Sequence, residues 1–337
     1  MIVPINHKSQ LADRQWLTAA ATLGGGALFA YAVRSADVGE ILQGIQRVGW
    51  GLAAILALAG LRFLIRAECW RLCMPPGTRL TFRQAFGAFL AGDALGNVTP
   101  LGLLASEPAK VFLTRHHLAT RESVASLAAE NLVYGASVVA MVAVGVAVLL
   151  ATVPLPEGWR WGLVAALGAG LVGAAVAWRL LRGTWDEGRG ARPWWRERLA
   201  RVRVAVLGFW AGHPARLWRA FGLDLVFHAL AVFEIYLTLR WLLGDRSPTI
   251  AQAIVFEALN RVVTVAFKFV PFRLGVDEAL TGAMAPLLAV NPAAGVALAV
   301  VRKIRNLAWS GIGLAIIAAH PQRADATSGS SPVGRTL

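Results

Sequence analysis

Apolar runs with few or no charges recur along the whole chain. A helix needs about 20 apolar residues to cross a bilayer, so seven runs of about this length predict seven spanning helices. They cover residues 16–33, 49–65, 131–153, 161–178, 220–239, 250–267 and 293–319. Two further stretches, 82–104 and 270–290, are apolar but interrupted by Gly and Pro, and predict broken segments instead of simple spans. The first run has the flanks of a signal peptide, but its length favours a retained anchor.

Composition agrees with a membrane protein. The chain is 57% hydrophobic and 15% charged, whereas soluble domains carry about 25% charged residues. Its formal net charge of +14 comes from basic residues in the gaps between apolar runs, which is typical of loops that face an anionic leaflet. We expect no nucleic-acid partner, because no soluble domain is available to carry that interface. The sequence lacks motifs for phosphate loops, metal sites and covalent nucleophiles, so we expect no cofactor, no metal and no catalytic residue.

The distribution of Lys and Arg predicts a multi-pass protein of the inner (cytoplasmic) membrane with both termini in the cytoplasm. The long basic loop 179–219 is placed inside, and the charge-balanced loop 244–249 outside. Within the basic loop, apolar residues recur at helical spacing from Trp194 to Phe209, with Arg residues between them. This pattern predicts an amphipathic helix over 194–209 that binds anionic inner-leaflet lipids. A loop helix packed on other protein is the alternative.

The domain organisation follows from the same pattern. We expect one transmembrane domain over residues 1–320, with halves at 49–153 and 220–319. A cytoplasmic loop at 182–216 joins the halves. The tail at 321–337 is rich in Ser, Gly and Pro and is expected to be disordered.

The two broken segments share a pattern. The first contains TPLGLLASEPAK over 99–110 and the second contains VPFRLGVDEALT over 270–281. In each, a Pro precedes a Glu by seven residues, a Gly lies between them, and a residue that commonly caps helices precedes the Glu. These residues are Pro100, Gly102, Ser106 and Glu107 in the first segment, and Pro271, Gly275, Asp277 and Glu278 in the second. Gly- and Pro-broken segments in both halves are typical of transporters. The sequence therefore predicts an all-α polytopic helix bundle with two inverted, re-entrant segments. Kinked ordinary spans, with each Glu at a helix N-terminus, are the alternative.

Ionisable residues within the apolar runs lie on helical stripes. Such charges cost about 2.5–3.5 kcal/mol each on insertion scales, so they usually face a cavity or a partner. The stripes are Ser123, Ser126, Glu130, Tyr134 and Ser137; Asp224 and His228; Glu257, Arg261, Thr264 and Lys268; and Arg302, Asn306 and Trp309. We expect a polar, mixed-charge interior. For Glu257 and Arg261 a structural helix pair is an equal alternative. As further alternatives, Asp224 and His228 could be interfacial, and Arg62 and Arg66 could reach the inner membrane surface.

The two loop motifs resemble those of the lysylphosphatidylglycerol synthase transmembrane-domain family, often called flippase-like. The matching residues are Asn97, Thr99, Pro100, Gly102, Glu107 and Lys110 in the first motif, and Pro271, Leu274, Gly275 and Glu278 in the second. Departures occur at Leu101, Ala105, Ser106, Phe272 and Arg273, where the family usually has Gly. The resemblance implies lipid handling. The soluble aminoacyl-transferase domain of the synthase members is not expected here, so we predict a protein that is not an enzyme.

The expected function is to bind a polar-headed lipid and translocate it between leaflets. The lipid would be a phospholipid, a hopanoid or isoprenoid, or a lipid-linked intermediate. A membrane subunit or scaffold for a lipid or glycolipid biosynthetic enzyme is the alternative. The predicted substrate-binding residues are Glu107, Lys110, Glu130, Glu257, Arg261, Arg273, Glu278, Arg302 and Arg305, and the predicted motif loops contain Asn97, Thr99, Pro100, Gly102, Pro271 and Gly275. The basic residues would neutralise a phosphate, and the carboxylates would bind a cationic headgroup or carry a proton.

Overall fold

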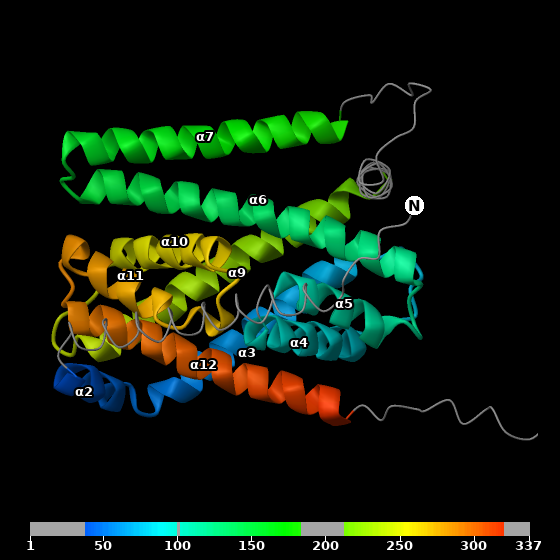
Figure 1. The fold of residues 1–337 in the computed structure, drawn as a ribbon, viewed down its shortest axis with the longest axis horizontal. Coiled ribbons are helices and arrows are strands. Elements are labelled where there is room, and N and C mark those ends of the chain that lie inside the picture. The colour runs from blue at the N-terminus through cyan, green and yellow to red at the C-terminus, as the bar shows by residue number, and fades with distance from the viewer. Residues whose placement is uncertain (1–37, 100–101, 183–211, 320–337) are drawn as a thin grey trace, which may run out of the picture.

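The computed structural model describes residues 38–99, 102–182 and 212–319. Throughout these ranges the chain forms helices and no strand, which confirms the all-α class (Figure 1). The α-helices are α2 (Val38–Val48), α3 (Gly51–Leu72), α4 (Phe82–Val98), α5 (Leu103–Thr114), α6 (Thr120–Thr152), α7 (Glu157–Arg182), α9 (Pro214–Leu242), α10 (Ile250–Ala266), α11 (Val276–Met284) and α12 (Pro292–Ala319). The first apolar run, the helix predicted over 194–209, Pro100 and the tail lie outside the described residues.

Each apolar run within the described ranges forms a helix, but not each helix is a span by itself. Taken singly, α6 and α9 are long and apolar enough to cross a membrane. The pair Ile41–Val48 and Gly51–Leu72, bent by 74°, makes a third candidate if it counts as one broken span. By contrast, α10 has only 17 residues, and α12 carries three basic residues in its middle. Those basic side chains are buried. Neighbouring helices therefore surround charges that would be costly to expose to lipid.

The helices that precede the two breaks, α4 and α10, begin in the same way. Thr81 before α4 and Thr249 before α10 each accept a hydrogen bond from a backbone N–H three residues on, at Gln84 and Gln252. Each Gln side chain in turn accepts from the backbone N–H of its Thr, at 2.9 and 2.7 Å. These are capping boxes, which satisfy two N-terminal donors at once. The same T-x-x-Q pattern therefore starts the helix before each break.

The helices that follow the two breaks begin earlier than the sequence analysis predicted. The N-caps are Gly102 for α5 and Gly275 for α11, so Ser106 and Asp277 lie inside their helices and the prediction that they cap them is wrong. Backbone geometry gives the reason. Gly275 has φ +80°, which glycine adopts without steric cost. A Cβ on Gly102 would collide with the carbonyl oxygen of Gly96 on α4, so only glycine allows this close approach of α4 and α5.

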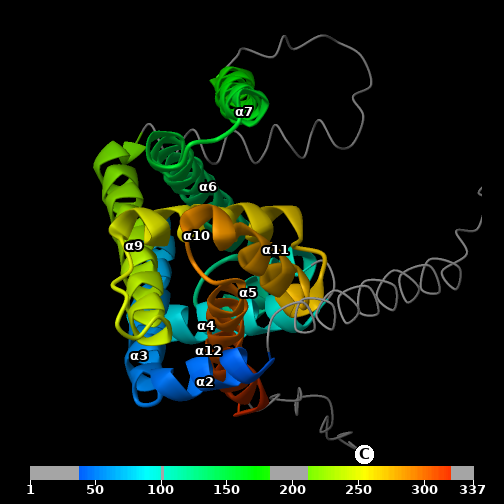
Figure 2. The ribbon, with the colours of Figure 1, turned by 90° about the vertical axis from the view of Figure 1, so that its left-hand side faces the viewer.

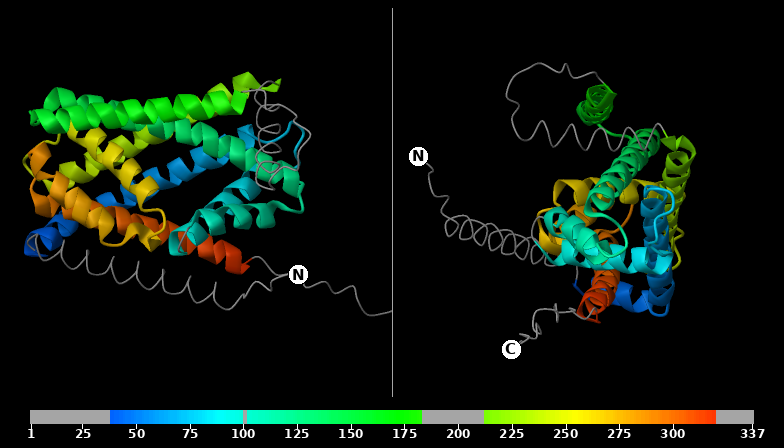
Figure 3. Two further views of the ribbon diagram at one scale, coloured as in Figure 1. Left: turned by 45° about the horizontal axis from the view of Figure 1, so that its top comes forward. Right: turned by 90° about the vertical axis from the view of Figure 1, so that its right-hand side faces the viewer.

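The two halves pack on each other reciprocally. Helix α3 packs on α4 as α9 packs on α10, and α4 lies along α12 as α10 lies along α6. The long helices α3 and α9 pack against each other lengthwise and antiparallel, along one side of the arrangement. Figure 3 shows these two helices side by side, and Figure 2 shows α7 outside them, where it packs along α6. The helices before the two breaks, α4 and α10, are therefore each held by a long helix of the other half.

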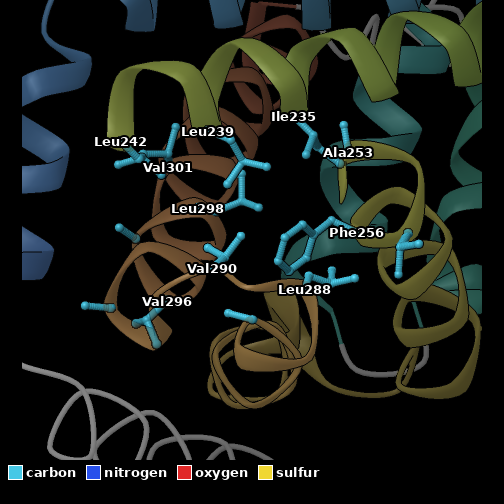
Figure 4. Close-up of a cluster of buried hydrophobic side chains, with 14 of the residues drawn as sticks. Ile235, Leu239, Leu242, Ala253, Phe256, Leu288, Val290, Val296, Leu298 and Val301 are labelled. Carbon is cyan, nitrogen blue, oxygen red and sulfur yellow. The ribbon is translucent and has the colours of Figure 1, made fainter. Parts of the chain in front are cut away.

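A cluster of buried apolar side chains packs α9, α10 and α12 together (Figure 4). Leu239 of α9, Phe256 of α10 and Leu298 of α12 are at most 1% exposed and belong to one buried cluster. Further along each of these helices the buried residues become polar, with Glu257 on α10 and Arg302 on α12. The apolar cluster therefore holds α9, α10 and α12 together next to the polar interior.

Candidate functional site

A cavity of about 260 Å³ lies between the two broken segments. The first segment lines it with Gly96, Asn97, Gly102, Ser106 and Glu107. The second segment lines it with Val270, Phe272 and Arg273. Two motifs about 170 positions apart in sequence thus meet at one cavity, which supports treating them as one site.

Basic side chains dominate the cavity. Among the described residues, seven basic side chains line it, namely Arg62, Arg66, Lys110, Arg261, Lys268, Arg273 and Arg305. Two acidic side chains line it, Asp93 and Glu107. Its wall therefore presents an excess of positive charge, which favours an anionic ligand.

The acidic partners of the arginines lie behind the wall. Arg62 forms an ion pair with Glu234 at 2.8 Å, and Arg305 pairs with the other carboxylate oxygen of Glu234. Arg66 pairs with Asp224 at 3.0 Å and with Glu130. None of these three carboxylates lines the cavity, and their side chains are at most 2% exposed. Buried charges need such partners because an unpaired charge inside a protein is costly.

These pairs correct two statements of the sequence analysis. The alternative that Arg62 and Arg66 reach the inner membrane surface is wrong, because both are less than 9% exposed and lie inside the bundle. Asp224 and His228 are also buried, so the interfacial alternative for them is wrong. The reason is the contact between α3 and α9, which places two arginines opposite carboxylates far away in sequence.

Tyr134 on α6 orders the arginines around it. The guanidinium of Arg66 lies 3.7 Å from the centre of the Tyr134 ring, a cation–π distance. Arg261 donates a hydrogen bond of 2.9 Å to the Tyr134 hydroxyl and pairs with Glu257 at 2.6 Å. Both guanidinium groups are thus held in one orientation without a ligand.

The first broken segment adds a polar cluster of its own. Lys110 pairs with Glu107 at 3.0 Å, and the Asn97 side chain donates to Asp93 at 2.9 Å. Asn97 also donates to Ser310 of α12 at 3.4 Å, which ties this segment to the other half. In the second half of the chain, just before the second break, Lys268 also lines the cavity. It has no ion-pair partner in the described part of the chain.

The predicted binding residues fall into three groups. Five of them line the cavity: Glu107, Lys110, Arg261, Arg273 and Arg305. Glu130 and Glu257 lie behind it as partners of arginines. Glu278 and Arg302 lie apart from it, because Glu278 pairs with Lys303 and accepts from the Gly275 N–H, while Arg302 donates to Thr281. Of the motif residues, Asn97 and Gly102 line the cavity, whereas Thr99, Pro271 and Gly275 do not.

Four charged cavity residues are missing from the predicted binding set, namely Arg62, Arg66, Asp93 and Lys268. The membrane surface was an alternative for Arg62 and Arg66, Asp93 was not considered, and Lys268 was placed on an interior stripe without a binding role. A signal was available for each. Arg62 and Arg66 are four residues apart on one helical face of an apolar run, and Asp93 precedes Asn97 by the same spacing. Charged residues so placed need partners inside the bundle.

Fold and site together define a class: a polytopic helical membrane protein with a basic cavity between two broken helical segments. The chain belongs to the family described as the lysylphosphatidylglycerol synthase TM region, whose sequence model matches residues 16–313. This confirms the resemblance in the loop motifs. No curated protein and no solved structure shows significant similarity to the chain. Family membership indicates a membrane protein connected with lipid biosynthesis or translocation.

Proposed function

We propose that this protein binds the anionic headgroup of a membrane lipid in the central cavity and moves the lipid between leaflets. One observation carries the proposal: seven basic side chains and only two acidic ones line the cavity among the described residues. Phosphate is the anionic group that lipids offer most often, and guanidinium groups match its geometry with paired hydrogen bonds.

The size of the cavity supports a headgroup as the ligand. Pockets that enclose a whole drug-sized molecule measure about 300–1,000 Å³, and this cavity measures about 260 Å³. It has room for a phosphate and a small substituent, but not for two acyl chains. The chains of a bound lipid would therefore remain outside the cavity.

The ion pairs behind the wall suggest how binding could be linked to movement. Arg62 and Arg66 of α3 hold α9 through Glu234 and Asp224. An anion in the cavity competes with these carboxylates for the same guanidinium groups, and so weakens the contact between α3 and α9. The reciprocal packing of the halves supports an inverted repeat, in which one half rocks against the other around the site.

A cationic headgroup receives less support. Of the carboxylates proposed for it, Glu130 and Glu257 pair with arginines behind the wall, and Glu278 lies away from the cavity. Glu107 lines the cavity but pairs with Lys110. Asp93 and Glu107 are thus available only as secondary contacts, for example to an amine carried by a zwitterionic headgroup.

Reconstituted vesicles test the proposal. The purified protein is placed in vesicles that contain fluorescent phosphatidic acid or fluorescent phosphatidylcholine, and the fraction of label accessible from outside is followed over time. We expect faster exchange of the anionic lipid than of phosphatidylcholine, relative to protein-free vesicles. Binding of phosphatidic acid without exchange would favour a membrane subunit of a biosynthetic enzyme instead. Neither binding nor exchange would contradict the proposed function.

A further inference from the structure

An apolar groove of about 560 Å³ runs between α5 and α6. Helix α5 lines it with Pro108, Val111 and Phe112, and helix α6 with Val124, Leu127 and Ala128. Leu127 belongs to a buried apolar cluster behind the groove, and the partly buried Val111 packs against that cluster. The opposite side is open, since Phe112 is 60% exposed and Val124 is 44% exposed.

The groove meets the basic cavity. Glu107 of α5 and Asn131 of α6 line both spaces, so the two adjoin at these residues. Arg115 lies at the other end of the groove. From Glu107 to Arg115 helix α5 rises about 12 Å, whereas one leaflet of a bilayer has a hydrocarbon depth of about 15 Å. The groove is thus an apolar channel of nearly one leaflet's depth that leads out of a polar cavity.

We propose that this groove holds an acyl chain of the lipid whose headgroup occupies the cavity, and that the lipid passes between α5 and α6 to reach it. The inference rests on the proposed function. It is carried by the contrast between the two adjoining spaces, because a ligand with one anionic end and one apolar end matches both. The cavity is too small for the chains, and the groove offers them an apolar path from the headgroup site.

Position 124 allows a direct test. Val124→Cys is labelled with a bulky maleimide after purification, so folding precedes the obstruction. The native Cys69 and Cys73 are buried and are expected not to react. The matched control is Val144→Cys on the same helix, at a position that is 50% exposed and does not line the groove. Binding is measured in detergent by native mass spectrometry with two probes, dioleoyl phosphatidic acid and glycerol 3-phosphate, which share the phosphate but differ in acyl chains.

We expect labelling at position 124 to weaken binding of phosphatidic acid by about tenfold or more, the effect of a severe steric misfit. Glycerol 3-phosphate binding should not change, and labelling at position 144 should affect neither probe. Unchanged binding of both probes after labelling at 124 would contradict the proposal that the groove holds an acyl chain, but not the proposed function. An equal loss of binding for both probes would also contradict that proposal, because labelling in the groove would then act on the headgroup cavity and not on an acyl chain. If the wild-type protein binds neither probe, both the proposed function and the proposal for the groove are contradicted.

Discussion

Arg62 of α3 and Glu234 of α9 form a buried ion pair of 2.8 Å across 172 positions of sequence. The second oxygen of Glu234 pairs with Arg305 of α12. One carboxylate thus joins a helix of the first half to two helices of the second. Both arginines line the cavity while Glu234 does not, so this residue supports the site from behind.

The first prediction concerns that carboxylate. Glu234→Ala leaves two buried arginines without their partner, and breaking a buried pair in this way costs about 3–5 kcal/mol. We expect a corresponding loss in the free energy of unfolding, measured by denaturant titration in detergent. Glu68→Ala is the control, because its pair with Arg71 is 37% exposed on both sides and should contribute about 0–1 kcal/mol. Equal effects of the two changes would show that the buried pair does not hold the halves together.

The second prediction separates binding from stability at Lys268. This residue lines the cavity and forms no ion pair with the described residues, so Lys268→Gln should not alter the unfolding temperature. It should weaken phosphatidic acid binding by about tenfold, the value of one lost charge-assisted hydrogen bond. Arg240→Gln removes an exposed positive charge outside the cavity and should leave binding unchanged. A similar loss of binding in both variants would point to net charge instead of the cavity.

The third prediction distinguishes two glutamates that the sequence repeat makes equivalent. Glu107 lines the cavity, whereas Glu278 pairs with Lys303 away from it. We expect Glu107→Gln to change the rate of lipid exchange in vesicles. It should lower the free energy of unfolding less than Glu278→Gln does, because the Lys110 that it leaves unpaired lines the cavity. Glu278→Gln leaves the buried Lys303 unpaired and should lower the free energy of unfolding by about 3 kcal/mol, with exchange preserved in the folded fraction. The reverse pattern would place the functional glutamate in the second segment.

The fourth prediction concerns the close approach of α4 and α5. Gly102→Ala places a Cβ against the Gly96 carbonyl and should destabilise the fold by about 1–3 kcal/mol. Gly135→Ala in the middle of α6 meets no neighbouring atom and should stabilise it by about 0.5–1 kcal/mol, through helix propensity. Thermal unfolding of both variants gives the comparison. A tolerated Gly102→Ala would mean that the two helices are not held this closely.

The fifth prediction is the membrane orientation. The basic loop 182–216 is expected in the cytoplasm and the loop between α9 and α10 outside. Single cysteines at Glu187 and Asp245, in a background with Cys69 and Cys73 replaced, are treated with a membrane-impermeant maleimide on intact cells. We expect labelling of Glu187→Cys only after the membrane is opened, and of Asp245→Cys before it. Labelling of Glu187→Cys on intact cells would reverse the orientation.

Sequence reasoning predicted the helices because the signals for them are local. An apolar run of about 20 residues and a break at Gly or Pro act over a few turns of chain. The stripe from Ser123 to Ser137 also faces the interior as expected, with Ser123, Glu130 and Ser137 buried, because helical periodicity alone places these residues on one face. Family membership likewise could be inferred from the two loop motifs.

Charge pairing depended on the tertiary structure. Arg62 and Arg66 lie near the end of an apolar run. This position in the sequence is compatible both with side chains that reach the membrane surface and with side chains that form ion pairs inside the bundle. The antiparallel packing of α3 on α9 decides between them, because it brings Glu234 opposite Arg62 and Asp224 opposite Arg66. The same holds for Glu107 and Glu278, which have equal spacing from Pro but unequal surroundings. Electrostatic partners depend on distance in space, and spacing along one helix determines only which face a residue occupies. The sequence by itself therefore determined the class, the helices and the breaks, while the packing of the two halves decided which charges face the cavity.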